Sequence, residues 1–139
     1  MNRSIYVTFW IVIAVFVFVM GVFFVPVVQD VFRGPIFLVP IGLFAVASGV
    51  LVWLVARSSI DSILKKFMLL AGVSGVGFFV GIILHNLFYA AGMLTVDIVI
   101  AKYFFEVLHV AFFLISTILC PIGFLIGAGG SMWYMKKKK

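Results

Sequence analysis

Four long apolar stretches, each bounded by charged residues, leave this chain very few folds. Residues 4–29, 34–56, 67–96 and 107–135 hold 26, 23, 30 and 29 residues without Asp, Glu, Lys or Arg. A helix needs about 20 apolar residues to cross a bilayer, and a charge near its centre costs several kcal/mol. The four stretches make up most of the 139 residues. The pattern therefore predicts four transmembrane helices.

The composition agrees with this prediction and argues against other classes of protein. The chain is 66% hydrophobic and 10% charged, with a mean hydropathy of +1.39. Soluble domains are about half apolar and a quarter charged, so a soluble enzyme, a disordered segment and a nucleic-acid-binding module all fit poorly. Barrel strands alternate polar and apolar residues, which these stretches do not. We expect an all-α integral membrane fold, a single domain over residues 1–139, forming a four-helix bundle. Its helices should lie near 5–28, 35–56, 66–91 and 103–130.

The distribution of Lys and Arg predicts the orientation of this bundle. Eight basic residues fall on the side of the termini, and two, Arg33 and Lys102, on the other; the eight are Arg3, Arg57, Lys65, Lys66 and Lys136 to Lys139. Basic loops stay in the cytoplasm, so both termini should be cytoplasmic in a multi-pass protein of the cell membrane. The four final lysines should meet anionic lipid headgroups, not nucleic acid. In a eukaryotic cell this ending would resemble a dilysine signal for retrieval to the endoplasmic reticulum.

Stripes of small residues predict how the third and fourth helices pack. Between helices in lipid, association depends on close backbone approach at small residues. The packing candidates recur every three or four residues and are Ser74, Gly77 and Gly81 in the third helix, with Ser116, Cys120, Gly123 and Gly127 in the fourth. An antiparallel pair with His85 level with His109 would place Ser74 opposite Cys120 and Gly81 opposite Phe113.

Other local features give further expectations. The first helix is almost uniformly bulky, so we expect it to be the most lipid-exposed helix or to meet a partner protein. Ser58 to Asp61 follow the capping-box pattern at the start of the third helix. Pro121 lies inside the fourth helix and should kink it, freeing a carbonyl that Ser116, Thr117 or a neighbouring helix would help to satisfy.

One cluster of polar residues lies at membrane depth near the outer surface. It comprises His85, Asn86, Tyr89, Glu106 and His109. The antiparallel connection of the two helices brings both histidines to the same level, and Glu106 shares a helix face with His109. Ionisable residues at this depth are functional candidates, because their desolvation must be offset.

Four interpretations of the cluster remain open. It could be a structural hydrogen-bond network, with each contact worth on the order of 1 kcal/mol. It could instead relay protons or ions through Glu106 and the histidines. A metal could be held by His85, Glu106 and His109, or a b-type haem between the two histidines, although a single Glu-x-x-His lacks the second copy that di-iron bundles use.

Other chemistry has little support in the sequence. The glycines lie in apolar stretches without a phosphate-loop lysine, and Cys120 is the only cysteine, so intrachain disulfides are impossible. We expect no cofactor and no enzymatic activity, but an accessory or assembly subunit that contacts the bilayer, other membrane proteins or further copies of itself. The alternatives are an oligomeric transporter of small solutes, ions or protons, and a metal- or haem-binding redox protein. We further expect Glu106→Gln and His109→Ala to lower thermal stability in detergent more than any transport flux.

Overall fold

The computed structural model describes residues 2–32, 34–95 and 97–138, which form helices joined by short turns. In chain order these are α1 (Arg3–Phe24), α2 (Pro26–Val31), the 3-10 helix η1 (Gly34–Phe37), α3 (Leu38–Ala56), α4 (Ser62–Leu94), α5 (Val99–Leu114), the π-helix η2 (Ile115–Leu119) and α6 (Cys120–Lys137). α5, η2 and α6 form one continuous helix. Within the described residues, four helices are long and apolar enough to cross a membrane: α1, α3, α4 and Val99–Lys137. The predicted all-helical fold is confirmed, and its four long helices are compatible with a membrane location.

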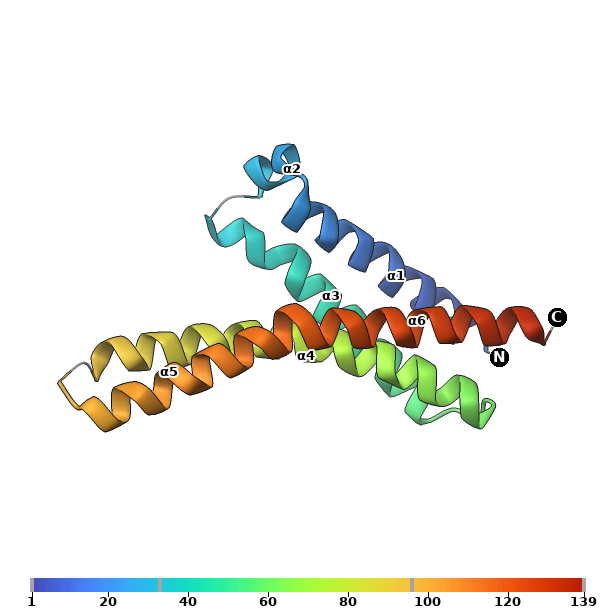
Figure 1. Ribbon diagram of the computed structural model, residues 1–139. Coiled ribbons are helices and arrows are strands. Elements are labelled where there is room, and N and C mark those ends of the chain that lie inside the picture. The colour runs from blue at the N-terminus through green and yellow to red at the C-terminus, as the bar shows by residue number, and fades with distance from the viewer. Residues whose placement is uncertain (1, 33, 96, 139) are drawn as a thin grey trace.

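The long helices form two hairpins that cross each other (Figure 1). α1 and α3 make the first hairpin, and α4 pairs with α5, η2 and α6 in the second. α4 is central, because it contacts α3, α5 and α6. Both termini and the α3–α4 turn lie at one end, here called the terminal end. The hairpins diverge toward the opposite, distal end. The distal part of the second hairpin, residues 82–95 and 97–114, is called the distal arm.

The first helix is shorter than predicted, because proline interrupts it. α1 ends at Phe24, and Val25 is extended with φ −104° and ψ 110°. Steric conflict with a following proline disfavours the helical region for the residue before it. Pro26 then starts the short helix α2. The chain reverses at Gly34, whose φ of +65° is a conformation that favours glycine. Arg33 and Lys139, which the charge pattern included, lie outside the described residues.

The third and fourth long helices extend beyond their predicted bounds, and the predicted capping box is wrong. α4 begins at Ser62 because Asp61 is its N-cap: Oδ1 of Asp61 accepts a 3.0 Å hydrogen bond from the Ile63 N–H. The Ser58 hydroxyl instead donates to the carbonyl of Val55, at the end of α3. The Lys65 ammonium also bonds to this end, donating to the Ala56 carbonyl at 2.8 Å. The last long helix runs from Val99 to Lys137, so it starts earlier and ends later than expected.

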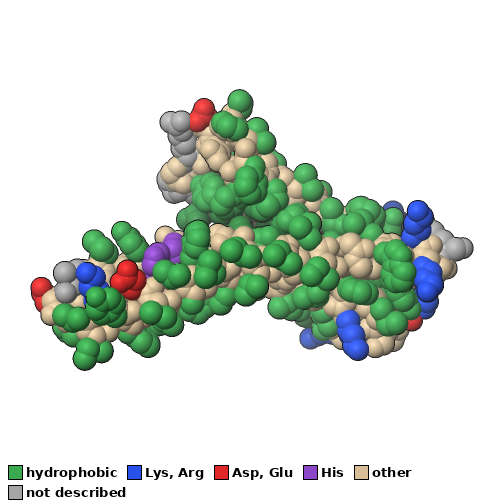
Figure 2. Space-filling model, viewed as in Figure 1, with side chains coloured by type: hydrophobic (Ala, Val, Ile, Leu, Met, Phe, Trp, Pro, Cys, Tyr) green, Lys and Arg blue, Asp and Glu red, His purple; other side chains and the backbone are tan. Residues whose placement is uncertain are grey.

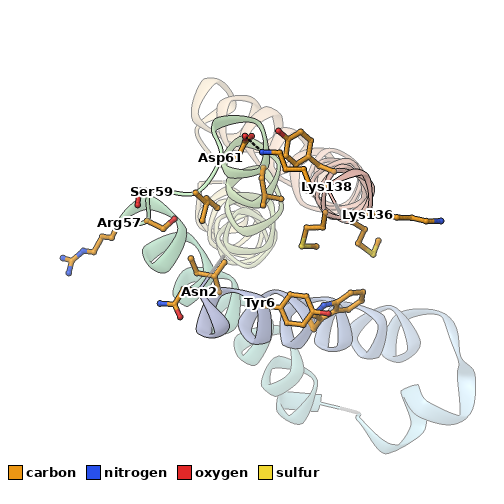
Figure 3. Close-up of a pocket in the computed structure, with 15 residues that line it drawn as sticks. Asn2, Tyr6, Arg57, Ser59, Asp61, Lys136 and Lys138 are labelled. Carbon is orange, nitrogen blue, oxygen red and sulfur yellow. Dashed lines mark hydrogen bonds and ion pairs between the residues drawn. The ribbon is translucent and has the colours of Figure 1, made fainter.

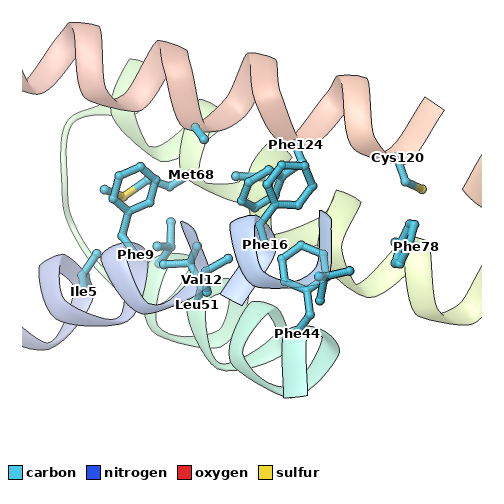
Figure 4. Packing of buried hydrophobic residues seen from close by; sticks show 14 of the residues in the cluster. Ile5, Phe9, Val12, Phe16, Phe44, Leu51, Met68, Phe78, Cys120 and Phe124 are labelled. Atoms are coloured by element: carbon cyan, nitrogen blue, oxygen red, sulfur yellow. The ribbon is translucent and has the colours of Figure 1, made fainter. Parts of the chain in front are cut away.

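The core lies where the hairpins cross and is built around aromatic rings (Figure 4). Phe16 of α1 stacks on Phe124 of α6 with ring centroids 4.2 Å apart. Phe44 of α3 meets Phe124 edge-on at 5.3 Å and Phe78 of α4 at 6.2 Å. These contacts join the two hairpins through large side chains, and no residue of α5 takes part.

The first alternative expected for the first helix, that it is the most lipid-exposed helix, is wrong, while the second, contact with a partner protein, stays a prediction. Every third or fourth residue of α1 is buried, namely Ile5, Phe9, Val12, Phe16, Val19 and Val22. By contrast, α5 buries no residue. Bulky side chains suit α1 because it meets α6 through stacked rings, whereas α4 approaches its neighbours through glycines. The least buried long segment is therefore α5, in the distal arm.

The small residues of α4 face those of η2 and α6, but their register differs from the predicted one by three residues. A Cβ placed on Gly81 would lie 2.8 Å from Ser116 Cβ, and one on Gly77 would lie 3.1 Å from Cys120 Sγ. Ser74 faces Gly123, with its hydroxyl 2.5 Å from a Cβ built there. Small residues thus meet small residues, which permits closer backbone approach than pairing small with large.

The distortion near Pro121 takes the form of a π-helix one turn before it. The Cys120 N–H bonds to the Ile115 carbonyl, five residues back. The hydroxyls of Ser116 and Thr117 donate to the Phe113 carbonyl at 3.1 and 2.6 Å. In an α-helix Pro121 would leave the Thr117 carbonyl, four residues before it, without a partner, whereas these two hydroxyls bond to the Phe113 carbonyl. The predicted compensation for the proline therefore stays a prediction.

Candidate functional site

The two histidines of the polar cluster are in direct contact across the distal arm. His85 of α4 and His109 of α5 stack with ring centroids 4.3 Å apart and an interplanar angle of 28°. Their Nδ1 atoms are 3.0 Å apart, and Nδ1 of His85 lies 3.1 Å from the carbonyl oxygen of His109. The antiparallel pairing of α4 with α5 positions both rings at one level, as the sequence predicted.

Aromatic side chains flank this histidine pair. Tyr89, one turn beyond His85, has its ring centroid 5.3 Å from that of His109. Phe113, one turn beyond His109, lies 5.3 Å from the ring of His85. Both histidines are half-buried, and Figure 2 shows the His side chains on the distal arm with hydrophobic side chains around them. The pair is thus held between rings that restrict its movement.

The other two residues of the predicted cluster, Asn86 and Glu106, lie in exposed positions beside the histidine pair and make no hydrogen bond with it. The Asn86 amide is exposed and donates a 2.8 Å hydrogen bond to the Ile82 carbonyl of its own helix. Glu106 is exposed and lines a small cavity of about 190 Å³ that also includes Tyr89, Lys102 and His109. The Glu106 carboxylate makes no hydrogen bond or ion pair with any other residue that the structure describes. The cluster is therefore a histidine pair with a carboxylate at its edge.

This geometry favours the structural interpretation over a metal or haem site. No three His, Cys, Asp or Glu side chains in the described ranges come close enough together to hold a metal ion. His85, Glu106 and His109 thus do not form the two-histidine, one-carboxylate set considered from the sequence. Rings stacked at 4.3 Å also leave no room for a macrocycle between them.

We expect His109→Ala to lower the thermal stability of the protein. For Glu106→Gln, which the sequence also predicted to be destabilising, we now expect no loss of stability. The alanine variant loses the stacked ring and the Nδ1 contact, worth about 1 kcal/mol in a membrane protein. Glu106→Gln keeps its shape at an exposed position and serves as the matched control. Thermal unfolding in detergent measures both variants, and equal losses of stability would contradict this assignment of contacts.

A second polar site lies at the terminal end, and the sequence analysis missed it. Lys138, just after α6, donates from Nζ to Oδ2 of Asp61 at 2.7 Å (Figure 3). The Lys138 ammonium also lies 5.2 Å from the centre of the Tyr134 ring. The contact joins the start of α4 to the end of the chain's last helix. The sequence signal was Asp61 itself, the one acidic residue on the strongly basic side.

This ion pair stands beside a cavity of about 1000 Å³ between α1, the α3–α4 turn and the end of α6. Its lining combines polar and apolar side chains and comprises Asn2, Ile5, Tyr6, Trp10, Arg57 to Asp61, Leu64, Met132, Tyr134 to Lys136, and Lys138. Most of the Lys and Arg side chains gather at this end (Figure 2). The cavity is therefore amphipathic and lies in basic surroundings.

The Asp61–Lys138 contact should make stability depend on pH. The hydrogen bond from Lys138, followed by that from Tyr134, holds the pKa of the Asp61 carboxyl well below its usual range. This contribution is present above the unfolded pKa of about 3.9 and is lost as pH falls through the folded pKa. The same hydrogen bond raises the pKa of Lys138, whose contribution is present below about 10.4 and is lost as pH rises through its folded pKa.

Asp61→Asn tests this dependence, because asparagine is also a good N-cap. The stability difference between the wild type and this variant should be constant from about pH 5 to 9 and shrink below about pH 4. Unfolding in detergent across this range measures it. Asp97→Asn, at the distal end away from Lys138, should show no such pattern. A difference for Asp61→Asn that does not change with pH would contradict the role of the ion pair.

The interior between the two sites contains few polar groups. Among the described residues, the buried polar side chains are Ser48, Ser74, Ser116 and Ser131. Ser131 donates to the Gly127 carbonyl at 2.7 Å, within α6. The Ser48 hydroxyl has no hydrogen-bond partner and faces Gly75. The Cys120 thiol is also buried there, against Gly77, but no buried Asp, Glu, His, Lys or Arg side chain among the residues described connects the distal cluster to the terminal end.

Comparison with known proteins adds no function to this description. No protein-family model matches the chain, and no curated protein or solved structure is significantly similar to it.

Proposed function

We propose that this protein is an integral membrane protein of four transmembrane helices with both termini in the cytoplasm. The four apolar helices support insertion. The gathering of basic side chains at the terminal end supports the orientation, since basic residues favour the cytoplasmic side. Trp53 and Trp133 lie near this end with Arg57 and Lys137 over their rings, as expected at a headgroup layer.

Within the membrane, we propose the role of a non-enzymatic accessory or assembly subunit. The observation that carries this proposal is the length of the second hairpin. Its helices, which end in the distal arm, are longer than is needed to cross the hydrocarbon core of a bilayer. α1 and α3, with 22 and 19 residues, are about 33 and 28 Å long and match a hydrocarbon core of about 30 Å. α4, with 33 residues, is about 50 Å long. Even at a tilt of about 40°, near the upper limit for transmembrane helices, it would project about 38 Å along the membrane normal.

The tip of the distal arm should therefore reach the headgroup layer while carrying apolar side chains. Leu94 is 87% exposed and Ile100 is 85% exposed. Met93, Ile98 and Val99 beside them are also exposed. Apolar surface at a polar level is typical of a protein contact site. We propose that another membrane protein covers this tip.

The polarity of the interior favours this role over transport by a single chain. Ion and proton pathways use titratable or polar side chains along the membrane normal. The described interior offers serine hydroxyls and the Cys120 thiol, and the titratable residues His85 and His109 contact each other in the distal arm. A conducting pathway would need several copies of the chain.

Insertion and orientation can be tested before the role. The protein should resist extraction from membranes by alkaline carbonate. Green fluorescent protein fused after residue 139 should fluoresce, because it folds in the cytoplasm, whereas a fusion inserted between α4 and α5, on the outer side, should not. Release by carbonate would contradict insertion, and a dark C-terminal fusion would contradict the orientation.

The assembly role is tested with two matched double variants. Leu94→Ala with Ile100→Ala truncates the tip, while Leu43→Ala with Val46→Ala truncates two side chains of α3 that are also exposed, at 57% and 67%. After crosslinking in native membranes, the amount of crosslinked complex with another membrane protein should be about ten-fold lower for the tip variant than for the wild type. A loss of this size is typical when central anchor residues of an interface are truncated. The α3 variant should give as much complex as the wild type. Equal recovery from both variants, or recovery of the wild-type chain alone, would contradict the proposal.

Liposome assays address the rival transport function. We expect no proton or ion flux above that of empty liposomes. A flux that His109→Ala abolishes without loss of stability would favour an oligomeric transporter and overturn the accessory role.

A further inference from the structure

The cavity at the terminal end has the shape and lining of a site for an amphipathic ligand. At about 1000 Å³ it lies at the upper end of the range for ligand pockets, roughly 300–1000 Å³. Phe16 and Phe124 bring α1 and α6 together in the core. The cavity lies between this contact and the terminal end, near the start of α1 and the end of α6. From there to the terminal end, α1 and α6 line opposite sides of the cavity.

The walls of this cavity are apolar. Ile5 and Trp10 line it from α1, and Met132 and Met135 line it from α6. Leu64 of α4, which is buried, also lines the cavity. Methionine side chains are flexible and polarizable, so they adapt to a chain of methylene groups. These walls suit an alkyl chain better than a small soluble ion.

The rim of the cavity is polar and carries more positive than negative charge. Its basic residues are Arg57, Lys136 and Lys138, against the single acid Asp61, which pairs with Lys138. Figure 3 shows Arg57 and Lys136 extending away from the cavity while Lys138 turns onto Asp61. The Arg57 guanidinium is held over the ring of Trp53, 4.7 Å from its centre.

Lys136 is the basic residue of the rim that remains available for a ligand. The neighbouring Lys137 lies over the ring of Trp133 at 5.4 Å and does not line the cavity. Lys136 makes no ion pair or ring contact with any residue in the described part of the chain. Rotation about its flexible side chain would bring its ammonium over the rim.

We propose that this cavity binds one anionic phospholipid, with an acyl chain between α1 and α6 and its phosphate at the rim near Lys136. The inference rests on the proposed membrane insertion, which would put the terminal end at the headgroup layer of the cytoplasmic leaflet. That leaflet holds the anionic lipids that basic residues attract. The lipid would fill the space that the chain leaves open between its first and last helices.

Native mass spectrometry of the full chain tests this proposal. The protein is released from detergent micelles that contain equal amounts of phosphatidylglycerol and phosphatidylcholine, and the lipids retained per chain are counted. We expect one retained lipid, predominantly phosphatidylglycerol. Met132→Trp should fill the cavity and abolish retention of both lipids. Leu125→Trp, at an exposed position of α6 outside the cavity, should retain lipid as the wild type does.

A pair of lysine variants separates a built site from general attraction to a basic surface. Lys136→Gln should lower phosphatidylglycerol retention about five-fold, as expected for one lysine at a membrane surface, and leave phosphatidylcholine retention unchanged. Lys137→Gln removes an equal charge one residue away and should have no effect. Equal losses from the two variants would indicate surface attraction only and overturn the site.

The remaining outcomes are also decisive. Equal retention by Met132→Trp and Leu125→Trp, or no retained lipid in the wild type, would overturn the proposal. Displacement of the lipid by millimolar inorganic phosphate would indicate a site for soluble anions instead. If carbonate releases the protein from membranes, the proposed function fails as well, whereas an inserted protein without retained lipid contradicts only this inference.

Discussion

Gly127→Ala should destabilise the protein by about 3 kcal/mol, at the upper end of the usual cost of overpacking. A methyl group on Gly127 would overlap the Ala71 backbone nitrogen and lie 2.7 Å from the Phe67 carbonyl oxygen. Backbone atoms cannot move aside by changing a rotamer, so α4 and α6 would have to separate along their whole contact. The central helix would then lose part of the packing on which the bundle depends.

Gly129→Ala is the matched control for this prediction. Gly129 lies two residues away on the same helix, is exposed, and has nothing within 4 Å of a built Cβ. Alanine is the better helix former, so this variant should be unchanged or more stable by up to about 1 kcal/mol. Unfolding by titration with sodium dodecyl sulfate in mixed micelles compares the two. Similar stabilities for the two variants would mean that α4 and α6 are not in close contact at Gly127.

Gly77→Cys should form a disulfide with the native Cys120 in nearly every molecule under mild oxidation. A Cβ on Gly77 lies 3.1 Å from Cys120 Sγ. In a disulfide, each Cβ lies about 3 Å from the partner's sulfur, given an S–S length of about 2.05 Å. The new bond would therefore close with little movement of either helix. A single substitution thus reports the register of α4 against α6.

The crosslink is detected by protection of both thiols from a maleimide reagent and by a reversible shift on gel electrophoresis. Val80→Cys, nearly one turn further along α4 at an exposed position, should leave both thiols free. Ser74→Cys tests the register expected from the sequence, in which residue 74 faces Cys120. More efficient crosslinking through Ser74→Cys than through Gly77→Cys would contradict the register described above.

The number of long helices and their small-residue faces could be predicted from the sequence, but their register could not. Charge-free stretches specify helices because a charge within the bilayer is costly. The spacing of Gly77, Gly81 and Gly123 specifies a face because helical periodicity is fixed. The offset along that face depends on how close two backbones come, and pairing Gly81 with Phe113 instead of Ser116 would have kept them apart.

The burial of α1 and the terminal ion pair depended on contacts between distant parts of the chain. The bulky side chains of α1 are equally compatible with lipid and with a core, because both environments are apolar. Phe16 is buried because Phe124 and Phe44 stand beside it in the folded chain. Asp61 and Lys138 are 77 residues apart, and no local pattern relates them. At the distal end, the contact of His85 with His109 followed from the hairpin, whereas the outward position of Asn86 did not.

By itself, the sequence determined that this chain forms four long apolar helices, because charge spacing and helical periodicity act within one segment at a time. Only the tertiary structure decided which surfaces are buried, which residues face each other and where a cavity remains. These outcomes depend on the crossing of the two hairpins and on backbone distances between helices. The same crossing leaves the distal arm unburied and the space between α1 and α6 open at the terminal end.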